Sequence, residues 1–130
     1  MDKKQVYNVG KIDIKKYSVI TADIKTNEVI ITDTQINHIK ERHPNDLDLF
    51  YKYGSHIIEN PDYMLEANKP NTAVVLKEIV DNDNRFQLIL RLKTSDDPLE
   101  FKNSIITFMK IDEKRYKKYL KSKKILYKRE

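Results

Sequence analysis

The segment 85–93 alternates between large apolar residues and a second, mixed set of side chains. Successive side chains of a β-strand point to opposite sides of the sheet. The alternation therefore predicts a strand with one buried apolar face and one face that carries cations. The apolar positions are Phe86, Leu88, Leu90 and Leu92, and the mixed positions are Gln87, Ile89, Arg91 and Lys93.

Three further segments have the apolar and β-branched composition of strands, and turn-forming residues separate them. Together with 85–93 they predict a four-stranded antiparallel meander. The further strands are expected at 63–67, 72–80 and 104–111, and the joining segments are 68–71, 81–84 and 94–103.

Two helices are expected before these strands. The first lies within 31–44, because Thr32 followed by Gln35 fits a capping box and Pro44 disfavours helical geometry at the residue before it. The second covers 47–58, where apolar residues recur at helical spacing.

The two ends of the chain complete the prediction. Strand-like segments at 5–14 and 16–24, and a turn at 25–28 that leads into 29–31, suggest a small β-hairpin or a leading arm over 1–28. A basic helix begins at Asp112, and 124–128 is either a short strand or a tail. Runs of helices and runs of strands are segregated, which predicts an α+β fold in one domain over 1–130, with amino-terminal helices packed on the meander and a basic helix or tail over 112–130.

Composition excludes several classes of site. The absence of cysteine excludes disulfides, thiolate zinc sites and cysteine nucleophiles, and two glycines are too few for a glycine-rich phosphate loop as the main site. No apolar run approaches membrane-spanning length, and the first residues lack the apolar core of an export signal. We expect a cytoplasmic protein that has no membrane partner.

Positive charge is concentrated at the carboxyl end. Residues 110–130 contain ten Lys or Arg against three acidic residues. Such a segment attracts polyanions, and its tyrosines can stack on bases. A solvated amphipathic helix explains the pattern equally well, and an anionic membrane surface is a weaker third explanation.

The helix expected within 31–44 carries the candidate catalytic residues. His38 and Arg42 are spaced i,i+4 and lie side by side on its flank, whereas His43 falls on the apolar arc with Ile36 and Ile39. An imidazole that titrates near neutrality beside a fixed charge suits acid–base chemistry on a phosphate. The same residues also suit the negative end of a helix dipole, and His43 can be a hydrogen-bonded core residue.

A metal site is not expected, because His38 and His43 are five apart and point in different directions, and no cofactor motif is present. The remaining side chains are His, Arg, Lys, Thr and Tyr, a set that can cleave RNA. A base removes the 2′-hydroxyl proton, cations stabilise the charged phosphorane, and an acid protonates the leaving 5′-oxygen. His38 or His43 would be base or acid, Arg42 and Arg91 would hold phosphate, and Thr107 would donate a hydrogen bond.

Three motifs allow comparison with a known family: the block His38-Ile39-Lys40-Glu41-Arg42-His43-Pro44, the helix end at Asn60-Pro61-Asp62, and Asn103-Ser104-Ile105-Ile106-Thr107-Phe108 before a basic terminus. With the meander, they resemble the phage- and mobile-element-associated nucleases of the barnase–EndoU–colicin–RelE (BECR) fold over roughly 29–128. Their most specific part is the His-x-x-x-Arg-His-Pro block.

The resemblance implies a metal-independent endoribonuclease without cofactors, often a toxin, that cleaves RNA such as tRNA or mRNA to a 2′,3′-cyclic phosphate. A toxin of this kind would have a cognate immunity or antitoxin protein as partner. By the resemblance, the motif positions fall on His38, Arg42, His43 and Thr107, and Arg91 and Tyr127 match more loosely. The candidate substrate-binding residues are Arg91, Lys93, Tyr127 and Lys128.

Each assignment has an alternative. Thr107 shares alternate positions with Ile105, Met109 and Ile111, so it can be an ordinary packing residue. The whole chain can also be a catalytically inactive RNA-binding or regulatory module of the same fold, or a protein-interaction domain of a mobile element.

Overall fold

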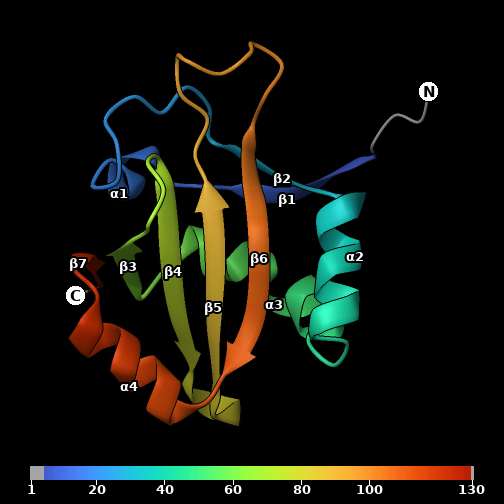
Figure 1. Cartoon of the computed structure of the whole chain (residues 1–130), viewed down its shortest axis with the longest axis vertical. Coiled ribbons are helices and arrows are strands. Elements are labelled where there is room, and N and C mark those ends of the chain that lie inside the picture. Colours follow the sequence, from blue (N-terminus) through green and yellow to red (C-terminus); the bar gives the residue numbers. More distant parts are fainter. Residues whose placement is uncertain (1–4, 130) are drawn as a thin grey trace.

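One seven-stranded sheet organises residues 5–129, the part of the chain that the computed structural model describes. The strands lie in the order β1-β2-β6-β5-β4-β3-β7 (Figure 1), and neighbours are antiparallel except for the parallel pair β2 and β6. The strands are β1 (Val6–Lys11), β2 (Glu28–Thr32), β3 (Tyr63–Glu66), β4 (Thr72–Ile79), β5 (Asn84–Arg91), β6 (Asn103–Ile111) and β7 (Ile125–Lys128). The helices are α1 (Ile14–Tyr17), α2 (Asp33–Arg42), α3 (Leu47–Glu59) and α4 (Glu113–Ser122), with a 3-10 turn η1 (Val80–Asn82).

The α+β class predicted from the sequence is confirmed, but the sheet is larger than the four strands expected. Strands β1 and β2 extend it beyond β6, and β7, at the segment left open between strand and tail, extends it beyond β3. The parallel join between β2 and β6 pairs Val29 with Asn103 and Ile30 with Ser104. Residues so far apart along the chain leave no local pattern, so the sequence could not predict this join.

Of the amino-terminal strands expected, the one at 16–24 does not form. Strand β1 pairs with β2, and α1 interrupts the region between them. Asp13 caps α1 by accepting a hydrogen bond from the Lys15 amide at 3.0 Å. The Tyr17 side chain is fully buried and its hydroxyl donates to the carbonyl of Ile58 at 2.8 Å, which fixes α1 against α3. Residues 1–4 of the expected arm and residue 130 of the expected tail lie outside the described residues.

The two faces of the sheet are covered to different extents. On the covered face, α1 and α3 pack against Phe86, Leu88 and Leu90, all 0% exposed, so the predicted apolar face of this strand is confirmed. On the other face, which we call the open face, α4 covers part of the sheet through Tyr116. In Figure 1, α3 crosses behind the long strands, while α4 runs from the end of β6 past the lower ends of β5 and β4 towards β7.

One charged group interrupts the covered face. Lys77 pairs in register with Phe86, and its side chain is 4% exposed. Its ammonium lies 3.1 Å from Oδ1 of Asp62, whose other oxygen accepts a hydrogen bond from the Glu78 amide at 2.8 Å. Arg129 also reaches Asp62, with 3.2 Å between Nε and Oδ1. These bonds compensate the charge that the core encloses.

The helices formed by residues 5–129 are all too short or too polar to cross a membrane.

Candidate functional site

The predicted start of α2 at Thr32 is confirmed, but only one of the two hydrogen bonds of the expected capping box forms. Oγ1 of Thr32 accepts a hydrogen bond from the Gln35 amide at 3.3 Å, which is half of a capping box. The Gln35 side chain turns instead to His38, with 3.3 Å between Oε1 and Nδ1. In the tautomer that donates from Nδ1, this contact leaves Nε2 of His38 as a proton acceptor.

The end of α2 sets the second histidine apart from the first. The His43 amide donates to the carbonyl of Ile39 at 2.8 Å, and His43 itself has left helical geometry at the residue before Pro44, as the sequence predicted. His43 is half-buried, whereas His38 and Arg42 are exposed. The His38 and Arg42 side chains are therefore free to reach a ligand.

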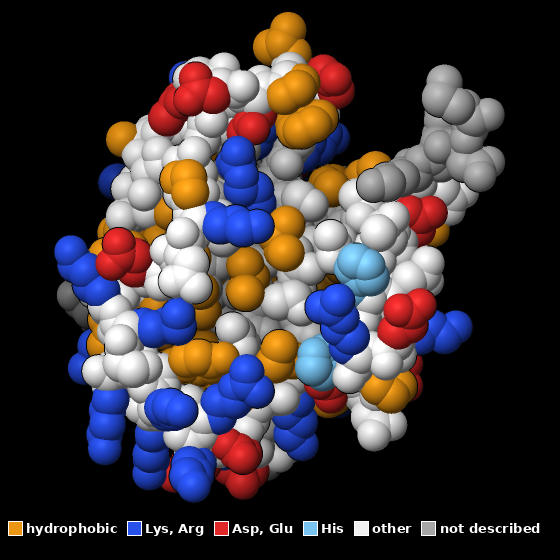
Figure 2. Space-filling view, viewed as in Figure 1, with side chains coloured by type: hydrophobic (Ala, Val, Ile, Leu, Met, Phe, Trp, Pro, Cys, Tyr) orange, Lys and Arg blue, Asp and Glu red, His pale blue; other side chains and the backbone are white. Residues whose placement is uncertain are grey.

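Helix α2 packs along β6 and buries Ile39 in the main core. Figure 2 shows histidine side chains over α2 and its carboxyl-terminal end, on the same view of the molecule as a central hydrophobic area bordered by Lys and Arg. The exposed candidate residues of α2 thus lie at one side of the open face.

A β-bulge in β6 aims Thr107 at this open face. On one side of the bulge Thr107 pairs with Ile89, and on the other side Ile105 pairs with Leu90. Ile106 is therefore the extra residue of β6. Paired residues point to the same side of a sheet, and a bulge shifts that alternation by one residue. Thr107 therefore shares the open face with Ile89 and is half-buried, while Ile105 is fully buried on the covered face. The alternation that grouped Thr107 with Ile105 was wrong for this reason.

A groove of about 640 Å³ lies on the open face beside Ile89. Residues of β4, β5, β6, α4 and the β3–β4 connection line it. Among the residues that the structure describes, its lining includes Arg91, Lys69 and Lys123 but no acidic residue. This hollow is large enough for a small ligand and suited to an anionic one.

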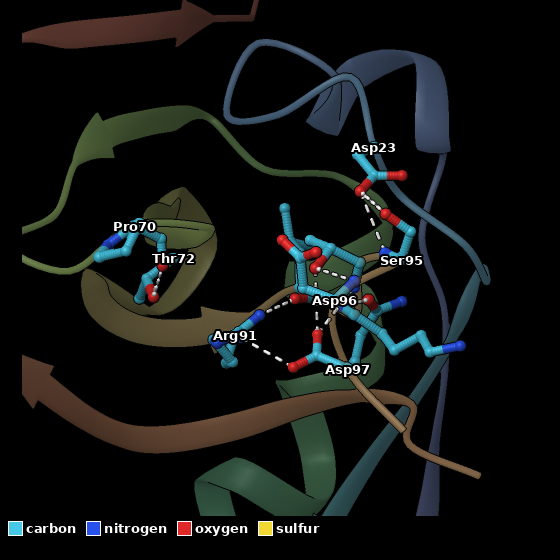
Figure 3. Close-up of polar contacts among 11 residues, drawn as sticks. Asp23, Pro70, Thr72, Arg91, Ser95, Asp96 and Asp97 are labelled. Carbon is cyan, nitrogen blue, oxygen red and sulfur yellow. Dashed lines mark hydrogen bonds and ion pairs between the residues drawn. The ribbon is translucent and has the colours of Figure 1, made fainter. Parts of the chain in front are cut away.

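Arg91 lines the groove and is also bound to the loop after β5. Figure 3 shows its guanidinium directed at Asp97, with 3.0 Å between Nη2 and Oδ1, and Nη1 also donates to the carbonyl of Leu92. The Asp97 carboxylate accepts a hydrogen bond from the Thr94 amide at 2.8 Å, and this bond, together with Arg91, lowers its pKa. A phosphate at Arg91 would have to share the guanidinium with Asp97.

The remaining predicted binding residues are not in this groove. Lys93 is 8% exposed, beyond the end of β5, and its amide donates to Oδ1 of Asn103 at 2.8 Å. Tyr127 and Lys128 lie in β7, at the end of the sheet opposite β1, and Tyr127 packs on the main core. Strands β3, β4 and β5 separate them from β6.

The sequence by itself assigns Gln35 only a capping role and Gln87 only a place on the mixed face of its strand, and it places Tyr119 only among the carboxyl-terminal tyrosines that can stack on bases. Gln87 is 6% exposed on the open face and accepts a hydrogen bond from the Tyr119 hydroxyl at 3.2 Å. The sequence placed Gln87 on the mixed face of its strand, and no local pattern predicts its contact with α4.

Among residues 5–129, no three His, Asp or Glu side chains converge as a group that could hold a metal ion.

A family model described as phage-Barnase-EndoU-ColicinE5/D-RelE like nuclease2 matches residues 5–128. No curated protein and no solved structure matches the chain.

Proposed function

The chain belongs to the family of phage nucleases that are like barnase, EndoU, colicins E5/D and RelE, and on this premise we propose that it is a metal-independent endoribonuclease of the cytoplasm. The substrate is RNA such as tRNA or mRNA. The proposal extends to a role as a toxin or a phage or mobile-element effector, which would include a cognate immunity or antitoxin protein as partner.

The observation that carries the proposal is the arrangement of α2 beside the bulged strand β6. Helix α2 presents the exposed His38 and Arg42, and the bulge turns Thr107 to the open face of the adjacent strand. An imidazole, a guanidinium and a hydroxyl are thus presented by two adjacent elements, α2 and β6. The groove on the open face has no acidic lining residue among the described residues. This combination supports chemistry on a phosphodiester.

The proposed reaction uses the nucleophile of the RNA itself. One histidine, His38 or His43, removes the proton of a ribose 2′-hydroxyl, whose oxygen then attacks the adjacent phosphorus. Arg42 stabilises the charge on the phosphorane oxygens, and Thr107 donates a hydrogen bond to one of them. The bond from phosphorus to the 5′-oxygen breaks and an acid protonates that oxygen, which leaves a 2′,3′-cyclic phosphate and a 5′-hydroxyl.

Gln35 would act as a positioning residue in this scheme. Its contact with Nδ1 favours the tautomer of His38 that has a free Nε2, and that tautomer can accept the 2′-hydroxyl proton. A base must have both the correct tautomer and a fixed orientation, because proton transfer requires a short, aligned approach.

The second candidate is an RNA-binding module without catalysis. The cationic rim of the groove and the basic α4 favour it, since both attract polyanions whether or not a bond is cleaved. This candidate predicts salt-sensitive RNA binding that does not depend on His38.

The test is incubation of the purified protein with total RNA and a tRNA pool in EDTA, with analysis of the product ends. We expect cleavage to 2′,3′-cyclic phosphate ends, reduced about 10²–10⁴-fold by His38→Ala, which is the usual contribution of a general acid or base. His56→Ala is the matched control, because His56 is exposed on α3 and its ring contacts Asn60.

Arg42→Ala is tested against Lys40→Ala, which removes an exposed charge from the same helix. We expect Arg42→Ala to slow cleavage far more than Lys40→Ala does. Cleavage that EDTA abolishes would disprove the metal-independent mechanism. RNA binding without cleavage by the wild-type protein would favour the second candidate.

A further inference from the structure

The groove on the open face has a fixed aromatic side chain at its α4 side. The hydroxyl oxygen of Tyr119 accepts hydrogen bonds from Nε and Nη2 of Arg115, at 3.2 and 3.0 Å, and donates to Oε1 of Gln87 at 3.2 Å. Three bonds at one hydroxyl hold the phenol ring in place. An aromatic surface that is ordered before binding loses little entropy when a ligand stacks on it.

The floor of the same groove combines apolar side chains with one polar group. Ile89 of β5 and Ile106 of β6 line it, and Ile106 is 39% exposed. Gln87 lies between them and α4, with Oε1 taken by Tyr119. Within residues 5–129, that bond leaves the Gln87 amide nitrogen available to donate to a ligand.

Charge distinguishes this groove from an ordinary apolar hollow. Lys69, Arg91 and Lys123 lie in its lining, and within 5–129 no described carboxylate does. The Lys123 ammonium also lies 6.0 Å from the centre of the Tyr119 ring. A ligand that fills the groove is therefore expected to be flat and apolar in one part and anionic in another, as a nucleotide is.

The groove also adjoins the proposed site of cleavage. Thr107 pairs directly with Ile89, and side chains opposed in this way on neighbouring strands have Cβ atoms about 4.5–5.5 Å apart. The bulge that turns Thr107 to the open face also exposes Ile106 to the groove. A nucleotide whose base enters the groove can thus keep its phosphate near Thr107.

We propose that this groove is a subsite for one unstacked nucleobase of single-stranded RNA, with Tyr119 as the stacking surface and the Gln87 amide as the group that hydrogen-bonds the base edge. The identity of the polymer rests on the proposed ribonuclease function. Lys69, Arg91 and Lys123 contact the backbone phosphates on either side of the base.

The test measures binding of short single-stranded 2′-fluoro RNAs, which lack the 2′-hydroxyl and so resist the proposed cleavage. A series in which one nucleotide at a time is abasic is titrated against the wild-type protein and Tyr119→Ala by fluorescence anisotropy. Loss of the base at one position should weaken wild-type binding about tenfold, because one base stacked on an aromatic ring contributes that order of affinity. Tyr119→Ala should bind the intact RNA as weakly as the wild type binds the abasic one, and should be insensitive to the abasic position.

Two further variants make the test specific. Tyr51→Ala removes a tyrosine that is 63% exposed on α3, and it should keep the response to the abasic position. Gln87→Leu replaces the amide with an apolar group of similar size. This variant should keep the RNA affinity that comes from stacking on Tyr119, but it should discriminate less among the four bases. Circular dichroism of each variant verifies that it is folded.

The outcomes separate the subsite from the ribonuclease function. An equal response of wild type and Tyr119→Ala to every abasic position, or no binding by the wild type, would overturn the subsite. Cleavage of RNA together with that equal response would leave the ribonuclease intact without the subsite. Position-specific binding that Tyr119→Ala abolishes, in a protein that cleaves no RNA, would support the subsite and reject the ribonuclease.

Discussion

The two faces of strand β5 are held by different kinds of contact. On the covered face, Phe86, Leu88 and Leu90 are completely buried against α3 and the neighbouring strands. On the open face, Gln87 is bonded to Tyr119 of α4, and Arg91 is bonded to Asp97 of the following loop. The covered face is thus held by continuous apolar contact, and the open face by individual polar contacts.

The difference indicates where stability and where function reside. Burial of apolar surface stabilises the fold by roughly 25 cal/mol per Å² and does not depend on direction, so the covered face accepts residues according to size and polarity. The contacts of the open face are directional and partly solvated, and each contributes less to the fold. Side chains on the open face are therefore free to be selected for a ligand.

The largest loss of stability is expected when the buried ion pair of the covered face, between Asp62 and Lys77, is broken. Replacement of Asp62 by Ala leaves the ammonium of Lys77 buried without its carboxylate, and loss of one partner of a buried pair typically costs about 3–5 kcal/mol. Denaturant unfolding should show a decrease of this size. The double variant Asp62→Ala, Lys77→Met should recover much of it, because the buried charge is removed as well.

Lys117→Ala is the control, since it breaks the exposed Lys117–Glu113 pair and should change stability little. If Asp62→Ala and Lys117→Ala unfold at the same denaturant concentration, the buried pair does not stabilise the covered face as argued.

The next largest loss of stability is expected from truncation of an apolar side chain, and it should differ between the two faces at adjacent positions. Leu88→Ala removes a fully buried side chain and should lower the free energy of unfolding by about 2–5 kcal/mol. Ile89→Ala, on the half-buried open face, should lower it by about 1 kcal/mol. Equal losses in urea denaturation would contradict the distinction between the faces.

A smaller effect should appear in activity without a change in stability. Thr107→Val keeps the shape of the side chain and removes the hydroxyl that the proposed mechanism uses. We expect cleavage to slow about tenfold, the order expected for loss of one hydrogen bond in the transition state. Single-turnover kinetics measure it, with Ser122→Ala, a hydroxyl removed from the exposed end of α4, as control. A loss of stability in place of a loss of rate would indicate a packing role for Thr107.

The smallest expected effect is a pH-dependent change in stability, caused by the polar contacts that Arg91 and Thr94 make with Asp97. The amide of Thr94 and the guanidinium of Arg91 lower the pKa of Asp97, so folding favours its ionised form. Its contribution to stability is present above the unfolded pKa of about 3.9 and is lost as pH falls through the lower folded value. Asp97→Asn should therefore be less stable than wild type at neutral pH, and the difference should disappear in acid. A constant difference in urea midpoints across this range would exclude ionisation as its cause.

Much of the fold was predictable because it depends on local patterns. The alternation in 85–93, the Thr32 cap and the stop at Pro44 each depend on a few neighbouring residues, and the structure confirms each of them. The short strand β7 and the capped α1 were ambiguous or missed, because brief segments with mixed composition suit several conformations.

The candidate site was predictable to a smaller extent. The spacing of His38 and Arg42 placed them side by side on one helix, and both are exposed. Gln87 and Tyr119 meet across 32 positions of the chain, and no spacing rule connects them. The open groove they line depends on how far α4 covers the sheet, which is a property of packing.

The sequence by itself determined the elements with local causes: the amphipathic strand, the capped helix and the concentration of cations at the carboxyl end. The tertiary structure alone decided which residues face the groove. The bulge at Ile106 shows the physical reason, because one residue without a partner in β5 reverses the direction of Thr107 relative to Ile105. Alternation along one strand cannot reveal such a shift, since register is set by pairing with the neighbouring strand.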